Sequence, residues 1–229
     1  MSNVADFEAS LGLRFKNREL LQQVFVHRSY LNEHRGFPLG DNERLEFLGD
    51  AVLELVVTEH LYNNYPNPEG ELTTWRSALV KGETLAVIAT ELNFPEFLLL
   101  SYGEEKSGGK TKGYILANTF EAFIGALYLD QGYEAADAFI HTSVLSRLEN
   151  ILANKLFMDP KSKLQEHTQE KFGMTPNYVV QGEDGPDHAK LFTVSVHIGD
   201  RELARGTGSS KQAAQVSAAE KALQTLIVS

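Results

Sequence analysis

The chain has 229 residues, of which 42% are hydrophobic and 23% are charged, and this composition is typical of a folded globular protein. It contains no cysteine, which excludes disulfides and thiolate metal sites. The formal net charge of −10 excludes the strongly basic surface of a tight nucleic-acid binder. Residues 1–158 carry most of this negative charge, with 22 acidic against 13 basic side chains.

The first part of the chain predicts helices and no membrane segment. Residues 3–35 carry apolar side chains at helical spacing and are expected to form a helix, a turn and a second helix. The stretch Met1 to Phe15 is acidic and lacks the apolar segment of a secretory signal. Apolar runs such as Phe97 to Leu100 are too short to span a bilayer. We therefore expect a cytoplasmic protein with no membrane partner.

The central predicted helix begins at residue 43, after Asp41 or Asn42 as its cap, and ends near Tyr62. Its acidic side chains follow one another at spacings of three or four residues and so form a stripe along the helix, next to a stripe of apolar side chains. The acidic residues are Glu43, Glu46, Asp50 and Glu54. Carboxylates stacked in this way repel one another, and Arg44 points elsewhere on the helix. A cation from outside the chain would balance them, and oxygen ligands suit Mg²⁺ or Mn²⁺. The alternative is an acidic face exposed to water.

A loop over residues 63–70 separates this helix from a helical pattern at residues 72–92, in which Trp75 is expected in the core. Lys81 to Thr84 interrupts that pattern, and Thr84 is expected to cap a second segment. Residues 104–112 combine glycines with three lysines and predict a flexible loop. These lysines could approach a phosphate backbone or lie in solvent.

A second motif lies in the helix predicted over residues 114–129. Asn118, Glu121, Ala122 and Gly125 share one face of this helix. Small residues beside an amide and a carboxylate allow another backbone to come close. We therefore expect Asn118 and Glu121 to face the central helix, the alternative being a packed helix with a polar edge.

The pattern changes near residue 159. Residues 131–158 predict a helix (135–152) and a linker, and the order afterwards is α-β-β-β-α, with helices at 160–171 and 211–226 and strands at 177–181, 189–198 and 202–207. Gly206 to Ser210 is expected to be a glycine turn that opens an alanine-rich helix. The predicted fold class is an all-α N-terminal domain followed by a small α+β C-terminal domain.

The stretch from Asn42 to Asp50, with the letters NERLEFLGD, resembles the signature of the ribonuclease III family at every position. Similar matches are His27-Arg28-Ser29, the Lys-Ser-Gly-Gly segment at 106–109 and the second motif at 115–126. The resemblance implies a catalytic domain at 3–130, a helix and linker at 131–158, and a homodimeric hydrolase that needs Mg²⁺, which Mn²⁺ can replace. His27 is expected to be a structural histidine near a helix end.

The resemblance also implies roles for individual residues. Metal ligands would be Glu46, Asp50, Asn118 and Glu121. Of these, Asp50 and Glu121 would position the attacking water and carry catalysis. Glu43 and Glu69 would be supporting acids, although Glu69 can equally be an acid favoured by a helix dipole. Phe47 would insert into the partner subunit, or else pack in the core.

Asn118 departs from the family pattern, which has an aspartate at this position. An amide retains one ligand oxygen and loses a negative charge, so a weaker Mg²⁺ site is expected. The competing hypothesis is therefore a dimer that binds duplex RNA and cleaves it weakly or not at all.

Residues 159–228 resemble the double-stranded-RNA-binding domain. The matching segments are Lys163 to Glu166, Pro176 to Tyr178, Gly185 to His188 and Gly206 to Lys211. The resemblance implies RNA contacts by Ser162, Gln165, Glu166 and Gln169 in one minor groove, by Pro186 and His188 in the next, and by Ser210 and Lys211 at phosphates. Gln212 stands where the family often has a basic residue, which predicts modest affinity.

Together these resemblances predict an endonuclease that cuts double-stranded RNA and leaves 5′-phosphate and 3′-hydroxyl ends with a short 3′ overhang. Ribosomal RNA precursors are the expected substrates, with messenger and transfer RNA precursors as further ones.

Overall fold

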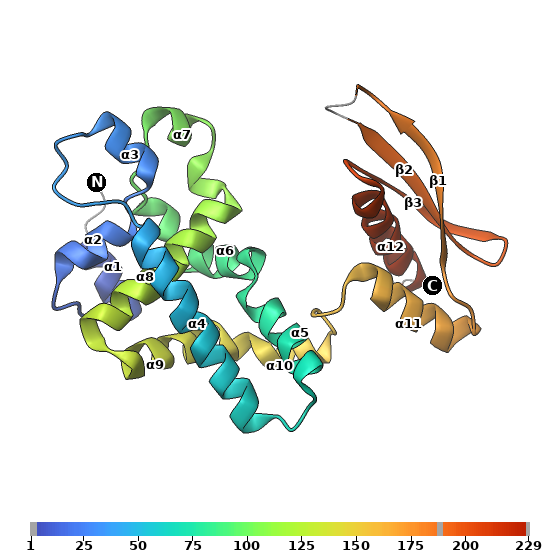
Figure 1. The fold of residues 1–229 in the computed structure, drawn as a ribbon, viewed down its shortest axis with the longest axis horizontal. Helices are drawn as coiled ribbons and strands as arrows, with labels where there is room; N and C mark the ends of the chain where they lie inside the picture. Colours follow the sequence, from blue (N-terminus) through green and yellow to red (C-terminus); the bar gives the residue numbers. More distant parts are fainter. Residues whose placement is uncertain (1–3, 187–189, 228–229) are drawn as a thin grey trace. The chain divides into compact units, whose positions relative to one another are not determined.

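The computed structural model describes residues 4–186 and 190–227, so Asp187 and the predicted RNA-contact residue His188 lie outside the described residues. The chain forms two compact units, Met1–Asn154 and Lys155–Ser229. The first is helical and the second combines helices with a three-stranded sheet (Figure 1), which confirms the predicted fold class. In the described parts of the chain, every helix is too short or too polar to cross a bilayer.

Three helices open the first unit, where two were predicted: α1 (Val4–Leu11), α2 (Arg18–Val24) and α3 (Arg28–Glu33). Asn17 caps α2, because its side-chain oxygen accepts hydrogen bonds from the N–H groups of Glu19 and Leu20. His27 caps α3, because its Nδ1 accepts the N–H of Ser29 at 3.2 Å. The extended backbone at His27 therefore separates α2 from α3.

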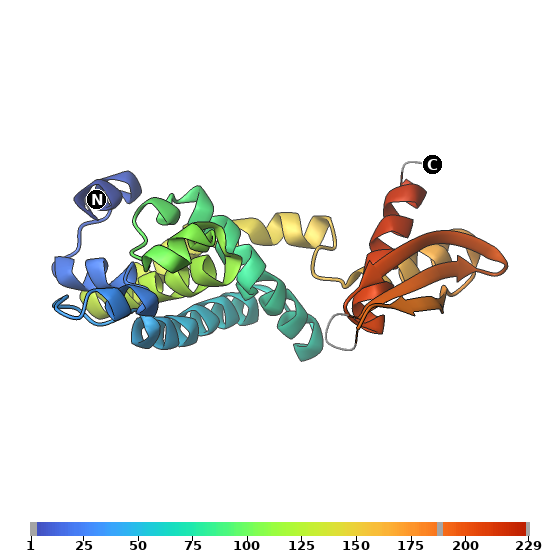
Figure 2. The ribbon, with the colours of Figure 1, turned by 90° about the horizontal axis from the view of Figure 1, so that it is seen from above.

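Two long helices form the centre of the first unit, α4 (Glu43–Asn64) and α8 (Gly113–Gln131). They lie against each other in both views (Figures 1 and 2). Asn42 occupies the N-cap position of α4, but its side chain makes no capping hydrogen bond. Asp41 accepts the N–H of Glu43 at 3.3 Å, whereas the buried Asn42 donates its amide to the carbonyl of Val24 at 2.8 Å and so ties α4 to α2.

The helical pattern after α4 is divided into α5 (Glu69–Val80) and α6 (Gly82–Glu91). The predicted capping role of Thr84 is wrong, because its hydroxyl donates to the carbonyl of Ala78 at 3.0 Å. Extended backbone at Lys81 makes the break instead, and Trp75 is buried as predicted.

The lysine-rich segment is ordered, unlike the predicted flexible loop. After the 3₁₀ turn η1 (Phe94–Glu96), it forms α7 (Tyr102–Lys106) and the 3₁₀ turn η2 (Gly109–Thr111). Lys112 donates to Glu104 at 2.6 Å, and Lys110 lies 3.1 Å from Glu105. Acids within the segment thus neutralise these two lysines and hold the turns together.

The single helix predicted over residues 135–152 is also divided, into α9 (Tyr133–Ser143), η3 (Leu145–Arg147) and α10 (Leu148–Ala153). The break falls where the hydroxyls of Thr142, Ser143 and Ser146 bond to backbone carbonyls three or four residues earlier. Such bonds compete with regular helix formation.

Phenylalanine rings from distant parts of the chain build the core of the first unit. Phe7 lies 5.0 Å from Phe25, 5.1 Å from Phe94 and 5.6 Å from Phe123, measured between ring centroids, in edge-to-face arrangements. These contacts join α1 to α8 and hold this long helix against the N-terminal part of the chain.

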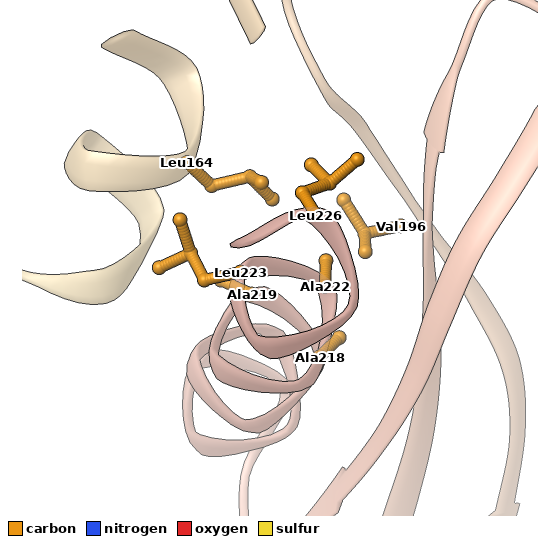
Figure 3. Packing of buried hydrophobic residues seen from close by; sticks show 7 residues of the cluster. All are labelled: Leu164, Val196, Ala218, Ala219, Ala222, Leu223 and Leu226. Carbon is orange, nitrogen blue, oxygen red and sulfur yellow. The ribbon is translucent and has the colours of Figure 1, made fainter. Parts of the chain in front are cut away.

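The second unit contains α11 (Pro160–Phe172), then β1 (Asn177–Asp184), β2 (Leu191–Ile198) and β3 (Arg201–Gly208) in an antiparallel sheet of order β1-β2-β3, and finally α12 (Lys211–Ile227). Both helices contribute to one core, in which Leu164 of α11 faces Leu223 and Leu226 of α12, with Val196 of β2 beside them (Figure 3).

The predicted glycine turn at residues 206–210 is wrong in one respect, because Gly206 and Gly208 belong to β3. A Cβ atom on Gly206 would lie 2.1 Å from the backbone nitrogen of Ala218, and one on Gly208 would lie 2.6 Å from that of Ala214. The glycines therefore allow β3 to lie directly on the alanine face of α12.

Candidate functional site

Two glycines set the distance between α4 and α8. A Cβ atom on Gly49 would lie 1.7 Å from the carbonyl oxygen of Glu121, and one on Gly125 would lie 2.2 Å from that of Leu45. The two backbones therefore touch at this point, which brings the polar face of α8 against the acidic face of α4. This is the close approach that the small residues of the second motif predicted.

The crossing places the predicted site residues around one cavity of about 500 Å³. It is lined by Glu43, Glu46, Phe47, Asp50, Asn118 and Glu121. Within the described residues, no ion pair joins Glu46, Asp50 or Glu121 to a basic side chain. The cavity therefore holds a concentration of negative charge that the surrounding described chain does not balance.

The electrostatics of the cavity are most marked at Glu121. Burial, together with the charges of Asp50 and Glu46, raises the pKa of its carboxyl group to about 7. Burial also raises the pKa of Glu46, and a hydrogen bond from the side chain of Asn118 acts in the opposite direction. Both shifts are those of carboxylates that lack a positive partner.

The chemistry of these donors fits a hard divalent cation. Carboxylate and amide oxygens are the ligands that Mg²⁺ and Mn²⁺ prefer, and a cation would relieve the repulsion that raises the pKa of Glu121. Within residues 4–186 and 190–227, no three acidic or histidine side chains are already arranged as a metal site. The fit to a divalent cation therefore rests on the chemistry of the donor atoms and not on a preformed arrangement.

Asn118 takes part in the cavity as a hydrogen-bond donor to Glu46. An aspartate at this position would add a further carboxylate beside Glu46 in place of that donor. The amide thus reduces the repulsion between the acids and, for the same reason, reduces their attraction for a cation.

Glu43 and Glu69 differ from the other acids. Glu43 lines the cavity and pairs with Arg28 of α3 at 3.3 Å. Sequence reasoning missed this partner, because fifteen residues and a loop separate the two and no local pattern links them. Glu69 lies at the start of α5, in a separate cavity of about 690 Å³ between α4 and α5, so the structure does not bring it together with the other acids in one chain.

Phe47 stands out among the apolar side chains, because 82% of its surface is exposed although it lies in the middle of the acidic motif. The alternative of core packing within one chain is therefore wrong. His27, in contrast, has a structural environment: it caps α3, and burial lowers its pKa.

In the second unit, the predicted contact residues of α11 share one exposed face. Ser162, Gln165, Glu166 and Gln169 line a concavity of about 730 Å³. The N–H and the hydroxyl of Ser162 both bond to Asp159, the cap of α11.

The other predicted contacts of this unit lie at its exposed ends. Pro186 is exposed at the last described position before the gap. Ser210 caps α12 by accepting the N–H of Ala213 at 3.1 Å, and the exposed Lys211 begins that helix. A helix N-terminus with a lysine is a site at which phosphate binds favourably.

Comparison with known families assigns both units. Residues 17–148 match the family described as "Ribonuclease-III-like", and residues 160–226 match the "Double-stranded RNA binding motif". Each match lies within one of the two compact units of the structure.

Known relatives match over nearly the whole chain. Proteins named Ribonuclease 3 are 44% identical in Streptococcus thermophilus, over 96% of this chain and 96% of the relative, and 45% identical in Enterococcus faecalis, over 94% of each. The crystal structure of the nuclease domain of ribonuclease III from Campylobacter jejuni is 41% identical, with a TM-score of 0.57, and covers 66% of this chain and 96% of that domain.

Proposed function

This chain belongs to the ribonuclease III family and is an endoribonuclease of double-stranded RNA, and we propose that it hydrolyses phosphodiester bonds with Mg²⁺ and leaves 5′-phosphate and 3′-hydroxyl ends. The observation that carries the proposal is the cavity at the crossing of α4 and α8, where Glu46, Asp50 and Glu121 gather with no basic side chain paired to them among the described residues. The RNA-binding motif in the same chain supplies the substrate class.

The proposed metal ligands are Glu46, Asp50, Asn118 and Glu121, with Mn²⁺ able to replace Mg²⁺. When bound, the cation supplies a Lewis acid that activates water and stabilises the leaving oxyanion. Asp50 and Glu121 are the proposed catalytic residues, because the charge of Asp50 acts directly on the half-buried carboxyl group of Glu121. They orient the attacking water, whose oxygen forms a bond to phosphorus while the bond from phosphorus to the 3′ oxygen breaks.

The acids Glu43 and Glu69 are proposed as supporting residues. Glu43 lines the cavity, and its pairing with Arg28 leaves it less available as a ligand than the other acids of the cavity. Glu69 can act at an active site only where another subunit meets the cavity between α4 and α5.

The test of this reaction compares substrates and products. The full chain, with Mg²⁺, is incubated with a duplex RNA, the same strands kept single, and the matching DNA duplex, and the new ends are identified by phosphatase and ligase treatment. We expect cutting of duplex RNA alone, with 5′-phosphate and 3′-hydroxyl ends. Equal cutting of single strands, or 5′-hydroxyl ends, would contradict the proposal.

Replacing Asn118 by aspartate is expected to lower the Mg²⁺ concentration that gives half-maximal cleavage by about tenfold, because a further carboxylate strengthens the attraction for a cation. Cleavage rates over a Mg²⁺ series measure this change. Asn63→Asp, at the exposed end of α4, is the control for the altered net charge and is expected to change nothing. An unchanged Mg²⁺ requirement in Asn118→Asp would remove Asn118 from the proposed ligands.

In the second unit, Ser162, Gln165, Glu166 and Gln169 are proposed to contact one minor groove of A-form RNA, and Pro186 and His188 the next. Ser210 and Lys211 are proposed to contact phosphates. The shared exposed face of α11 and the helix N-terminus at Lys211 support these roles.

We also propose that the enzyme is a homodimer held in part by Phe47. Phe47 lies in the second turn of α4 with 82% of its surface exposed, so the described part of its own chain leaves this apolar side chain largely uncovered. A structure of the nuclease domain of Campylobacter jejuni ribonuclease III, 41% identical with a TM-score of 0.56, was described as flexible in a region involved in dimer formation.

Phe47→Ala is expected to raise the dimer dissociation constant by about a hundredfold, since a buried aromatic anchor contributes roughly 2–4 kcal/mol to an interface. Sedimentation equilibrium measures this constant. Tyr102→Ala, another exposed aromatic residue with 72% of its surface exposed, is the control and should leave the constant unchanged. If Phe47→Ala dimerises as the natural chain does, the proposed contact is wrong.

The proposed division of the chain is a catalytic domain at 3–130, a helix and linker at 131–158, and an RNA-binding domain at 159–228. We propose processing of ribosomal, messenger and transfer RNA precursors in the cytoplasm as its role, because such transcripts contain long duplexes. The competing hypothesis of a dimer that binds without cutting is not favoured, since the relatives that match almost the full chain are named as nucleases.

A further inference from the structure

The exposed face of α11 continues beyond the helix itself. Its concavity is lined by Lys155 and Met158 as well as by the predicted contact residues. Lys155 precedes the helix by five positions and lies outside residues 160–226, which match the RNA-binding motif. The face formed with α11 is therefore larger than the segment that the motif defines.

A tight turn brings Lys155 over this face. Its backbone has a φ of +49°, a left-handed conformation that residues other than glycine rarely adopt. The N–H of Met158 closes the turn by donating to the carbonyl of Lys155 at 3.2 Å. The Nζ of Lys155 then lies 2.7 Å from a carboxylate oxygen of Glu166, in the second turn of α11.

The ion pair is open to solvent, which allows Lys155 to exchange partners. The side chains of Lys155 and Glu166 are 49% and 48% exposed. An exposed ion pair of this kind contributes little to stability, so its loss is readily offset by a contact between the ammonium group and a phosphate.

The charge of the face also requires a cation. Glu166 and Glu170 both line the concavity and would repel the phosphates of an approaching duplex. Among the described residues that line it, Lys155 is the basic one. Its ammonium group therefore compensates the negative charge of one of these two carboxylates on the face that the RNA duplex would approach.

We propose that Lys155 is an RNA-contacting residue that completes the minor-groove face of α11. Its ammonium group contacts a phosphate at the edge of the groove and shields Glu166, while the amides and the hydroxyl of α11 meet the 2′-hydroxyls inside the groove. This inference rests on the proposed role of α11 as the RNA-reading helix.

The test measures binding of the full chain to a blunt RNA duplex of about 20 base pairs, without divalent cations so that no cleavage occurs. Lys155→Gln is expected to weaken binding about fivefold at roughly 0.15 M salt and to reduce the slope of log affinity against log salt by about one. Lys155→Arg is expected to retain both values within about twofold.

Lys221→Gln is the matched control, because it removes the same charge from an exposed position about 15 Å along α12 from Lys211. It should leave the affinity and the slope nearly unchanged. If Lys155→Gln and Lys221→Gln behave alike, the proposal is wrong. Weaker binding of Lys155→Gln with an unchanged salt slope and a lower unfolding temperature would show a structural role and would also overturn it.

The binding measurements distinguish a failure of the proposed Lys155 contact from a failure of the proposed RNA-reading role of α11. Tight binding by the natural chain that is insensitive to Lys155 overturns the contact alone. Failure of the natural chain to bind duplex RNA overturns the contact together with the proposed role of α11.

Discussion

Replacing Glu121 by glutamine is expected to reduce the cleavage rate of duplex RNA by about a thousandfold, because the change removes a charge that is proposed to hold the cation and to orient water. The amide has nearly the same shape as the carboxylate, so the crossing of α4 and α8 should persist. Affinity for duplex RNA in the absence of divalent cations should also persist, since the second unit supplies the RNA-binding motif. Single-turnover cleavage and a gel-shift measurement separate these effects.

The pH dependence of the unfolding temperature also distinguishes Glu121 from a residue with a purely structural role. The folded chain raises the pKa of Glu121 to about 7 from its ordinary value near 4.5, so ionisation of this group costs stability as the pH rises between those values. Glu121→Gln removes that cost and is expected to raise the unfolding temperature above about pH 7 in the absence of metal. Glu134→Gln, at an exposed position in α9, is the control that should change neither rate nor stability. Near-normal cleavage by Glu121→Gln would contradict the proposed catalytic role.

Replacing Gly49 by alanine is expected to destabilise the first unit by about 3 kcal/mol and to abolish most cleavage. The added methyl group would lie 1.7 Å from the carbonyl oxygen of Glu121 and 2.8 Å from the backbone nitrogen of Gly125. Backbone atoms cannot rotate away, so α4 and α8 must separate. The separation moves Glu121 away from Glu46 and Asp50, and unfolding curves together with cleavage rates measure both consequences.

Gly70→Ala is the matched control within a helix of the same unit. Gly70 belongs to the first turn of α5, and apart from its chain neighbours and the backbone of its own helix, no described atom lies within 4 Å of the position that its Cβ would take. Alanine there is expected to stabilise the chain by about 0.5–1 kcal/mol, because it restricts the unfolded chain and favours the helix. If Gly49→Ala is as stable and active as Gly70→Ala, the tight crossing does not position the site.

The candidate site was predictable because its residues obey helical periodicity. Glu46 and Asp50 are four residues apart on α4, and Asn118 and Glu121 are three apart on α8, so each pair shares a helix face. Gly125 and Ala122 indicated that this face of α8 meets another backbone. Residue patterns alone therefore predicted which two helices approach each other and through which faces.

Features that depend on tertiary contacts were not predictable. The pairing of Arg28 with Glu43 joins two segments whose proximity depends on the fold of the N-terminal helices. The placement of Gly206 and Gly208 within β3 has the same origin, since glycine favours turns locally and only the approach of α12 requires it in a strand. The order of the lysine-rich segment likewise results from its pairing with Glu104 and Glu105.

The most direct test of the proposed active site follows cleavage and binding of one duplex RNA by the natural chain over a series of Mg²⁺ and Mn²⁺ concentrations. If the cavity at the crossing of α4 and α8 is the active site, cleavage rises with metal to a plateau, stops with a chelator, and requires more metal than cleavage by Asn118→Asp. A chain that binds the duplex but cuts it at no concentration of either metal would contradict this assignment, and the protein would then be a duplex-RNA-binding dimer.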